Sequence, residues 1–271
     1  MTVPSVDLGK YSIPQIGLGF WQVEDSEQFN AAFTSAVKAG YRHFDSAQIY
    51  KNEALLGKAW TASSLPRKDI FLTTKVWLDN FTSRRLRRSV DESLEKLQTE
   101  YIDLLLLHFP VTGLRKGAWK ALEEVKAAGL ARTIGVSNYT IRHLEAMKQY
   151  ASELPAVNQV ELHVFLQQPE LVTYCRDNGI ILEAYSPLAH GKDMQNEVVQ
   201  SLADQHGKSY AQIMLRWCIE SGFVVLPKSV TPKRIEENIN IFDFELTAAD
   251  MQRLTASNRN LRTCWNPTLV P

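Results

Sequence analysis

The chain has 271 residues, and its 30 Lys and Arg balance 30 Asp and Glu to give a formal net charge of zero. This balance argues against attraction to nucleic acid or to an anionic membrane. With 45% apolar and 22% charged residues, the composition is typical of a globular protein and excludes a disordered, collagen-like or disulfide-built chain. No linker-like stretch divides the sequence, so we expect one domain over residues 1–271.

The cysteines and the N-terminal segment favour a cytoplasmic protein. Cys175, Cys218 and Cys264 are an odd number without metal-like spacing, so we expect neither a disulfide framework nor a metal site. Residues 1–13 lack the apolar core of a signal peptide, and the longest apolar runs have only the length of a strand. We expect a monomer with no membrane or nucleic-acid partner.

Short apolar runs alternate with amphipathic segments, which is the pattern of parallel strands joined by helices. After a hairpin around residues 6–13, eight such runs predict strands at 15–19, 41–45, 70–75, 102–108, 133–136, 157–160, 180–184 and 223–226. The clearest intervening helix is 83–97, where four apolar residues fall on one face: Leu86, Val90, Leu94 and Leu97.

Eight units of this kind predict an α/β fold, a closed (β/α)₈ TIM barrel with a short N-terminal β-hairpin. Gly40, Gly129 and Gly179 each follow a helical run and precede a strand, where a left-handed C-cap is expected. An open dinucleotide-binding sheet is disfavoured, because the stretch from Gly17 to Gln22 lacks the third glycine of that fingerprint. In a closed parallel barrel the active site lies at the carboxyl ends of the strands.

Four polar residues follow three successive predicted strands: Asp45 and Tyr50, then Lys75, then His108. Together they suit the delivery of a proton to a carbonyl oxygen. A phenol alone is a weak acid with a pKa of about 10, and a nearby lysine ammonium is expected to lower that pKa while a carboxylate holds the lysine. His108 would orient the carbonyl. Because no side chain supplies hydride, a reduced nicotinamide is implied.

At these residues the sequence resembles the aldo-keto reductase superfamily over nearly its whole length. Gly40-Tyr-Arg-His-Phe-Asp-Ser-Ala-Gln-Ile-Tyr50, with Asn52-Glu53 and Gly57, is similar to the first family signature. Later motifs follow in the family's order: Leu-Leu-His108-Phe-Pro110, Gly135-Val-Ser-Asn138, Asn158-Gln159-Val-Glu-Leu-His163, Tyr185-Ser-Pro-Leu188 and Pro227-Lys-Ser-Val230. Within the family the chain resembles the small prokaryotic-type 2,5-diketo-D-gluconate and methylglyoxal reductases.

The resemblance implies NADPH (NADP⁺) as cofactor and a set of residues that bind it. These are Ser137, Asn138, Gln159, Tyr185, Ser186, Leu188, Lys228, Ser229, Val230, Arg234, Glu237 and Asn238. The side chains at the ends of the fifth and sixth strands would bind the carboxamide, and Tyr185 would stack on the ring. Lys228 and Arg234 flank the start of the last barrel helix, where a ribose 2′-phosphate would be favoured.

The same resemblance implies that Tyr50 is the general acid, that Lys75 and Asp45 adjust the pKa of its phenol, and that His108 orients the carbonyl. Aromatic residues would line the substrate pocket: Trp21, Trp77 and Phe109, together with His108. The tail, about 258–271, would lie near this pocket. We therefore expect NADPH-dependent reduction of small carbonyls such as methylglyoxal, keto sugar acids or aromatic aldehydes.

Two other functions fit parts of the sequence. The chain could be an NADPH-binding redox-sensing subunit with little turnover, although the complete set of four polar residues argues against that. It could also be a cofactor-free barrel enzyme that uses Lys75 as a Schiff-base amine, which predicts no nicotinamide binding.

Overall fold

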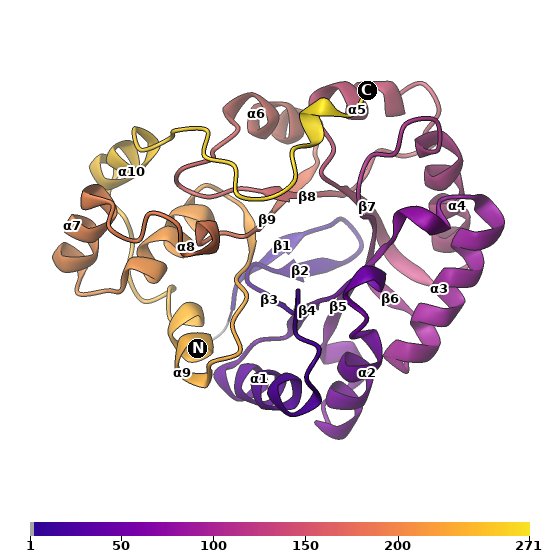
Figure 1. The fold of residues 1–271 in the computed structure, drawn as a ribbon, viewed down its shortest axis with the longest axis horizontal. Coiled ribbons are helices and arrows are strands. Elements are labelled where there is room, and N and C mark those ends of the chain that lie inside the picture. Colours follow the sequence, from indigo (N-terminus) through magenta and orange to yellow (C-terminus); the bar gives the residue numbers. More distant parts are fainter. Residues whose placement is uncertain (1–2) are drawn as a thin grey trace.

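The computed structural model describes residues 3–271, and in it eight parallel strands form a ring surrounded by helices (Figure 1). The strands are β3 (Leu18–Gly19), β4 (His43–Asp45), β5 (Phe71–Val76), β6 (Ile102–Leu107), β7 (Ala131–Ser137), β8 (Val157–Glu161), β9 (Ile181–Tyr185) and β10 (Val224–Leu226). Each strand pairs with its neighbour in the chain. Gly17 N–H donates to Val225 O (2.9 Å) and Gly19 N–H to Pro227 O (3.1 Å), which closes the ring and confirms the barrel.

Within residues 3–271, ten α-helices connect the strands or follow the last one. They are α1 (Ser26–Ala39), α2 (Glu53–Ala62), α3 (Ser83–Leu97), α4 (Arg115–Ala127), α5 (Ile141–Met147), α6 (Pro169–Asp177), α7 (Glu197–His206), α8 (Tyr210–Glu220), α9 (Pro232–Ile239) and α10 (Ala248–Thr255). Helix α3 has the predicted bounds, and Gly40 ends α1 in the predicted left-handed conformation, with φ at 107°. None of the helices among residues 3–271 combines the length and apolarity that a membrane span requires.

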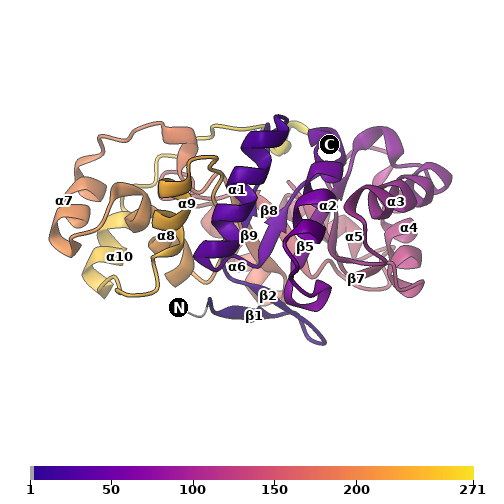
Figure 2. The ribbon, with the colours of Figure 1, turned by 90° about the horizontal axis from the view of Figure 1, so that it is seen from below.

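The N-terminal hairpin closes one end of the barrel. Its strands, β1 (Ser5–Asp7) and β2 (Ser12–Pro14), lie below the ring in Figure 2, at the opposite end from the C-terminal segment. Ile13 is buried against residues at the starts of barrel strands, including Phe71, Val157 and Val224. The amino-terminal half of the barrel interior is therefore packed with apolar side chains.

The barrel interior becomes polar toward the other end. Side chains alternate between the two faces of a strand, so His43 and Asp45 of β4 share the face opposite to that of Phe44. Thr73 and Lys75 of β5, and Gln159 of β8, occupy the same interior, and all of these polar residues are buried. Buried polar groups require partners, which makes the carboxyl ends of the strands the place to examine for a site.

Gly57 in α2 provides a test of the helix packing. A Cβ at this position would lie 2.1 Å from Lys96 O, a backbone atom of α3 that cannot move aside alone. We expect Gly57→Ala to lower the free energy of unfolding by more than about 2 kcal/mol. The matched control is Gly117→Ala at an exposed position of α4, where the Cβ would meet nothing within 4 Å. We expect it to be neutral or up to about 1 kcal/mol stabilising. Denaturant unfolding measures both, and equal effects would contradict the packing.

Candidate active site

An ion pair between β4 and β5 lies at the centre of the carboxyl end of the barrel. Lys75 Nζ donates to Asp45 Oδ1 (2.6 Å) and to Ser46 O (3.0 Å), and the lysine side chain is fully buried. Removing two charges from water is costly unless their remaining hydrogen-bonding capacity is satisfied. Because its ammonium is committed to these two acceptors, Lys75 is poorly suited to act as a Schiff-base amine.

Tyr50 lies beside this pair, at the end of a short 3₁₀ turn after β4 (Gln48–Tyr50). Gln48 fixes the turn, since its Nε2 donates to Ser89 O (3.2 Å) and its Oε1 accepts from Trp77 N–H (2.9 Å). Lys75 Nζ is 5.0 Å from the centre of the Tyr50 ring. The same glutamine thus holds the loops that carry Tyr50 and Trp77.

His108 completes the group from the end of β6. Its imidazole meets the Tyr50 ring edge to face, with centroids 5.6 Å apart, and the Trp77 ring at 5.2 Å. His108 Nδ1 is buried and has no hydrogen-bond partner among residues 3–271. The structure therefore brings together the four residues that the sequence singles out, Asp45, Tyr50, Lys75 and His108.

The protonation states are set mainly by burial. Loss of hydration raises the pKa of Tyr50 well above its usual value, and the charge of Asp45 raises it further. The expected lowering of this pKa is wrong in direction, because burial and the neighbouring charge of Asp45 raise it instead. Burial, with a smaller contribution from Lys75, holds the pKa of His108 well below its usual value. At neutral pH the site contains a protonated phenol and a neutral imidazole.

A second hydrogen-bonded group continues around the rim from β7 to β9. Asn138 follows β7 in the left-handed region, with φ at 65°, and its Nδ2 donates to His108 O (3.0 Å). Its Oδ1 accepts from Tyr185 OH (2.7 Å). Ser137 Oγ donates to Gln159 O (2.8 Å). The sequence predicts that these residues bind the carboxamide and the ring of the nicotinamide. Hydrogen bonds join them into one group, the β7–β9 group, beside the catalytic candidates.

The remaining predicted cofactor residues lie farther along the rim. Ser186 and Leu188 follow β9, while Lys228, Ser229 and Val230 follow β10 and precede α9, which carries Arg234, Glu237 and Asn238. Lys228 and Arg234 are exposed, and neither forms an ion pair with any residue in 3–271. We refer to these six residues after β10 and in α9 as the β10–α9 group. Within residues 3–271, no hydrogen bond joins this group to the β7–β9 group.

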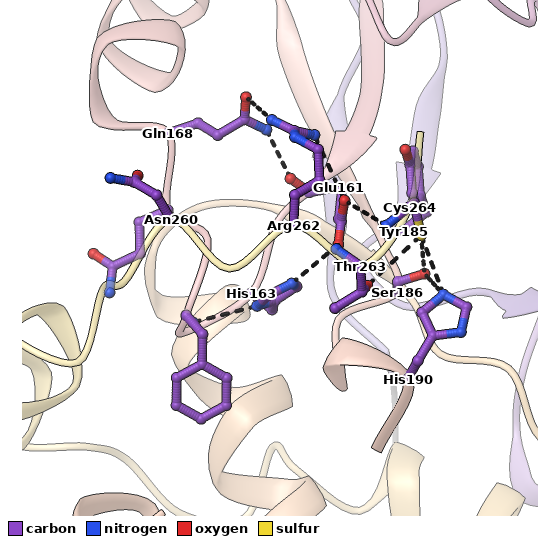
Figure 3. Close-up of polar contacts among 12 residues, drawn as sticks. Glu161, His163, Gln168, Tyr185, Ser186, His190, Asn260, Arg262, Thr263 and Cys264 are labelled. Atoms are coloured by element: carbon purple, nitrogen blue, oxygen red, sulfur yellow. Dashed lines mark hydrogen bonds and ion pairs between the residues drawn. The ribbon is translucent and has the colours of Figure 1, made fainter. Parts of the chain in front are cut away.

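The C-terminal tail is bound to the rim through Glu161 at the end of β8 (Figure 3). The Glu161 carboxylate accepts hydrogen bonds from Thr263 N–H and Oγ1 (both 2.6 Å) and from Cys264 N–H (3.2 Å). Arg262 lies 3.5 Å from the same carboxylate. Burial favours a higher pKa for Glu161, but hydrogen bonds from His163 and Thr263 hold the pKa below its usual value.

This anchor brings Trp265 over the candidate site. Its ring centroid lies 5.9 Å from that of Trp77, 6.1 Å from that of His108 and 6.0 Å from that of Phe109. On the other side of the rim, the exposed Trp21 meets the His190 ring edge to face at 5.4 Å. Three of the four predicted pocket residues therefore contact Trp265, whereas Trp21 contacts the loop after β9.

The sequence reasoning missed several residues that build the site. Gln48 and Asn52 lie within the signature stretch but carry structural hydrogen bonds; Asn52 Nδ2 donates to Phe20 O (2.8 Å) and Val23 O (3.0 Å). Glu183 lies inside the otherwise largely apolar strand β9, and a carboxyl group in a buried strand is a signal that could have identified it. Glu161 ends strand β8, which already carries Asn158 and Gln159. The tail contact of Glu161 spans about 100 residues of sequence, so nothing local indicates it.

Comparisons with known proteins identify the family of this chain. The model of the Aldo/keto reductase family matches residues 15–259. The chain is 43% identical to glyoxal reductase of Bacillus subtilis, covering 94% of this chain and 92% of that protein. It is 41% identical to methylglyoxal reductase DkgA of Escherichia coli K12, covering 94% and 93%.

Solved structures show the same fold. An aldo/keto reductase from Brucella melitensis superposes with a TM-score of 0.92 at 43% identity, covering 95% of this chain and 99% of that one. An aldo-keto reductase of Bombyx mori, solved in complex with NADP, gives 0.91 at 30% identity, covering 97% and 95%. The chain belongs to the aldo/keto reductase family, and it is accordingly an NADP-dependent oxidoreductase.

The neutral state of His108 can be tested through stability. Because its pKa is lowered in the folded protein, the unfolded chain binds the extra proton below about pH 6.5, and His108 costs stability as the pH falls. We expect the destabilisation caused by His108→Gln to shrink by about 1 kcal/mol between about pH 7 and pH 5.5. Denaturant unfolding of both proteins at the two pH values measures this, and a pH-independent difference would show that folded His108 titrates normally.

Proposed function

We propose that this protein reduces small aldehydes and ketones with NADPH, and that Tyr50 is the general acid. The observation that carries the proposal is the convergence of Tyr50, His108 and the Asp45–Lys75 pair at one rim of the barrel. Structural residues have no reason to gather at the carboxyl ends of barrel strands, where active sites lie. The names of the glyoxal and methylglyoxal reductases support a small carbonyl as substrate.

The roles of the four residues follow from their surroundings. Tyr50 keeps its proton at neutral pH because burial raises the pKa of the phenol, and it can give that proton to a carbonyl oxygen. The Lys75 ammonium, held by Asp45, then stabilises the phenolate. His108, kept neutral, can donate a hydrogen bond that orients the carbonyl. The reduced nicotinamide, when bound, supplies the hydride.

The residues of the β7–β9 group fit the nicotinamide end of the cofactor. Ser137, Asn138 and Gln159 offer amide and hydroxyl groups for its carboxamide, and Tyr185 is held by Asn138 in position for ring stacking. Gln159 Oε1 accepts no hydrogen bond from residues 3–271, and this atom is not fully buried. It can therefore accept a hydrogen bond from the carboxamide. We assign Ser186 and Leu188, which follow Tyr185, to the same cofactor.

The β10–α9 group fits the adenosine end. Lys228 and Arg234 are exposed cations beside the N-terminus of α9, where backbone N–H groups favour an anion. A ribose 2′-phosphate matches this charge, which supports NADPH over NADH. We assign Ser229, Val230, Glu237 and Asn238 to the same end of the cofactor.

The pocket proposed for the substrate is aromatic. Trp77, Phe109 and Trp265 surround His108, and Trp21 borders the opening. We propose that the tail from about residue 258 closes this pocket and belongs to a single domain with the barrel. Such a space favours small or flat carbonyl compounds, including methylglyoxal and aromatic aldehydes.

Removing the Tyr50 hydroxyl tests the assigned acid. We expect Tyr50→Phe to keep its NADPH affinity but to lose about 10²–10⁴-fold in kcat, because no other group delivers the proton. Fluorescence titration measures binding, and NADPH oxidation with methylglyoxal measures turnover. The matched control is Tyr150→Phe, which removes a buried hydroxyl without a partner in residues 3–271. Near-normal turnover of Tyr50→Phe would show that the assigned acid is wrong.

Arg234→Ala tests the 2′-phosphate assignment. We expect it to weaken NADPH binding by about tenfold or more while NADH binding changes little, because a charge-assisted hydrogen bond to the phosphate is lost. Titration with each dinucleotide measures the two dissociation constants. Lys233→Ala, which removes the neighbouring exposed cation of α9, controls for net charge. An equal loss of affinity for NADPH and NADH would show that Arg234 does not bind the 2′-phosphate.

A further inference from the structure

A second carboxyl group lies inside the barrel, below the four catalytic candidates. Glu183, at the centre of β9, is fully buried and faces the interior. From β4, His43 approaches it, with Nε2 3.5 Å from Glu183 Oε1, and Asp45 is linked to it through Gln159 of β8. A carboxyl group buried this deeply costs stability unless it is neutral or hydrogen-bonded. Its partners therefore indicate what it does.

The amide of Gln159 joins this carboxyl group to the catalytic ion pair. Gln159 Nε2 donates to Asp45 Oδ2 (2.9 Å) and to Glu183 Oε2 (2.6 Å), which uses both of its N–H groups. The reverse orientation of the amide would set its oxygen against the Asp45 carboxylate, and the two acceptors would repel each other. The Asp45 carboxylate therefore fixes which way the amide points, and Glu183 accepts the second N–H group of the amide in that orientation.

This orientation leaves the amide oxygen for the cofactor. Both N–H groups of the amide are occupied, whereas its Oε1 accepts no hydrogen bond from residues 3–271 and can accept one from a carboxamide N–H. We propose that Glu183 is a positioning residue: it holds the Gln159 amide with its oxygen toward the nicotinamide site and joins that site to the Asp45–Lys75 pair. The inference rests on the proposed function of this rim.

The protonation state of Glu183 sets the net charge beside the Asp45–Lys75 pair, and this charge affects the proposed carbonyl reduction. Burial, together with the neighbouring Asp45, raises the pKa of Glu183 to about 8, while the Gln159 hydrogen bond and Lys75 oppose the rise. His43 does not balance a charge there, since burial lowers its pKa to about 3 and its Nε2 lies 3.0 Å from Thr73 Oγ1. With its proton, Glu183 adds no charge beside the Asp45–Lys75 ion pair at neutral pH.

Ionisation of Glu183 would change this balance. Above about pH 8 a second negative charge would enter beside Asp45, with Lys75 as the facing cation. That charge opposes formation of a phenolate on Tyr50, which reduction of a carbonyl requires. We therefore expect kcat for reduction to fall as Glu183 loses its proton.

Two substitutions of Glu183 distinguish its role in positioning the Gln159 amide from a role in packing the barrel interior. Glu183→Leu removes the acceptor for Gln159, and we expect it to weaken NADPH binding about tenfold or more and to lower kcat. Glu183→Gln keeps an acceptor of the same shape, so we expect near-wild-type binding and kcat at pH 7, with the decrease in kcat above about pH 8 abolished. Val157→Ala, at an apolar interior position of β8, is the control for lost packing and should change neither value.

A measurement without cofactor tests the same assignment. Infrared difference spectra of the cofactor-free protein should contain the carbonyl stretch of a protonated buried carboxylic acid, which titrates near pH 8 and disappears in Glu183→Gln. This variant also keeps the proposal falsifiable if Glu183→Leu fails to fold. Absence of the band would overturn the protonated state of Glu183, and an alkaline limb of kcat retained by Glu183→Gln would overturn its part in the pH dependence.

The outcomes also distinguish this inference from the proposed function. If the wild-type protein oxidises NADPH with methylglyoxal but Glu183→Leu folds and binds NADPH as tightly as wild type, only the positioning role is wrong. If the wild-type protein binds no NADPH and reduces no carbonyl, the proposed function fails, and the positioning role toward a nicotinamide fails with it, whatever the infrared band shows about the Glu183 proton.

Discussion

The buried ion pair between Asp45 and Lys75 is the constraint around which the rest of the site is arranged. Lys75 is fully buried, and it remains tolerable as a charge because Asp45 and the Ser46 carbonyl oxygen accept from its ammonium. The other oxygen of Asp45 requires a donor as well, and Gln159 supplies it from the opposite side of the barrel. One pair of charges thus organises side chains from β4, β5, β8 and β9.

Burial gives this arrangement its chemical character. The same loss of hydration that makes the ion pair costly holds Tyr50 protonated, keeps His108 neutral and leaves Glu183 with its proton at neutral pH. Each neutral group reduces the charge that the barrel must bury, and each also has the protonation state that its proposed role requires. Stability and the proposed chemistry are therefore served by the same low polarity of the surroundings.

The tail contributes through a different kind of contact. Glu161, at the end of β8, binds the backbone of Thr263 and Cys264, and this places the exposed Trp265 beside Trp77 and His108. The barrel supplies the polar groups, whereas part of the proposed pocket wall comes from the last residues of the chain. The tail residues that contact Trp77 and His108 are thus separate from the Asp45–Lys75 pair in the chain.

The sequence by itself determined the barrel and the four polar residues at its rim. Periodicity predicts each strand to within a few residues, and because the carboxyl ends of parallel strands meet, Asp45, Lys75 and His108 could be brought together without coordinates. Only the tertiary structure decided the direction of the Tyr50 pKa, the bridge from Gln159 to Glu183 and the rings that Trp265 contacts. Those features depend on burial and on contacts between distant segments, and neither is encoded in the local pattern of residues.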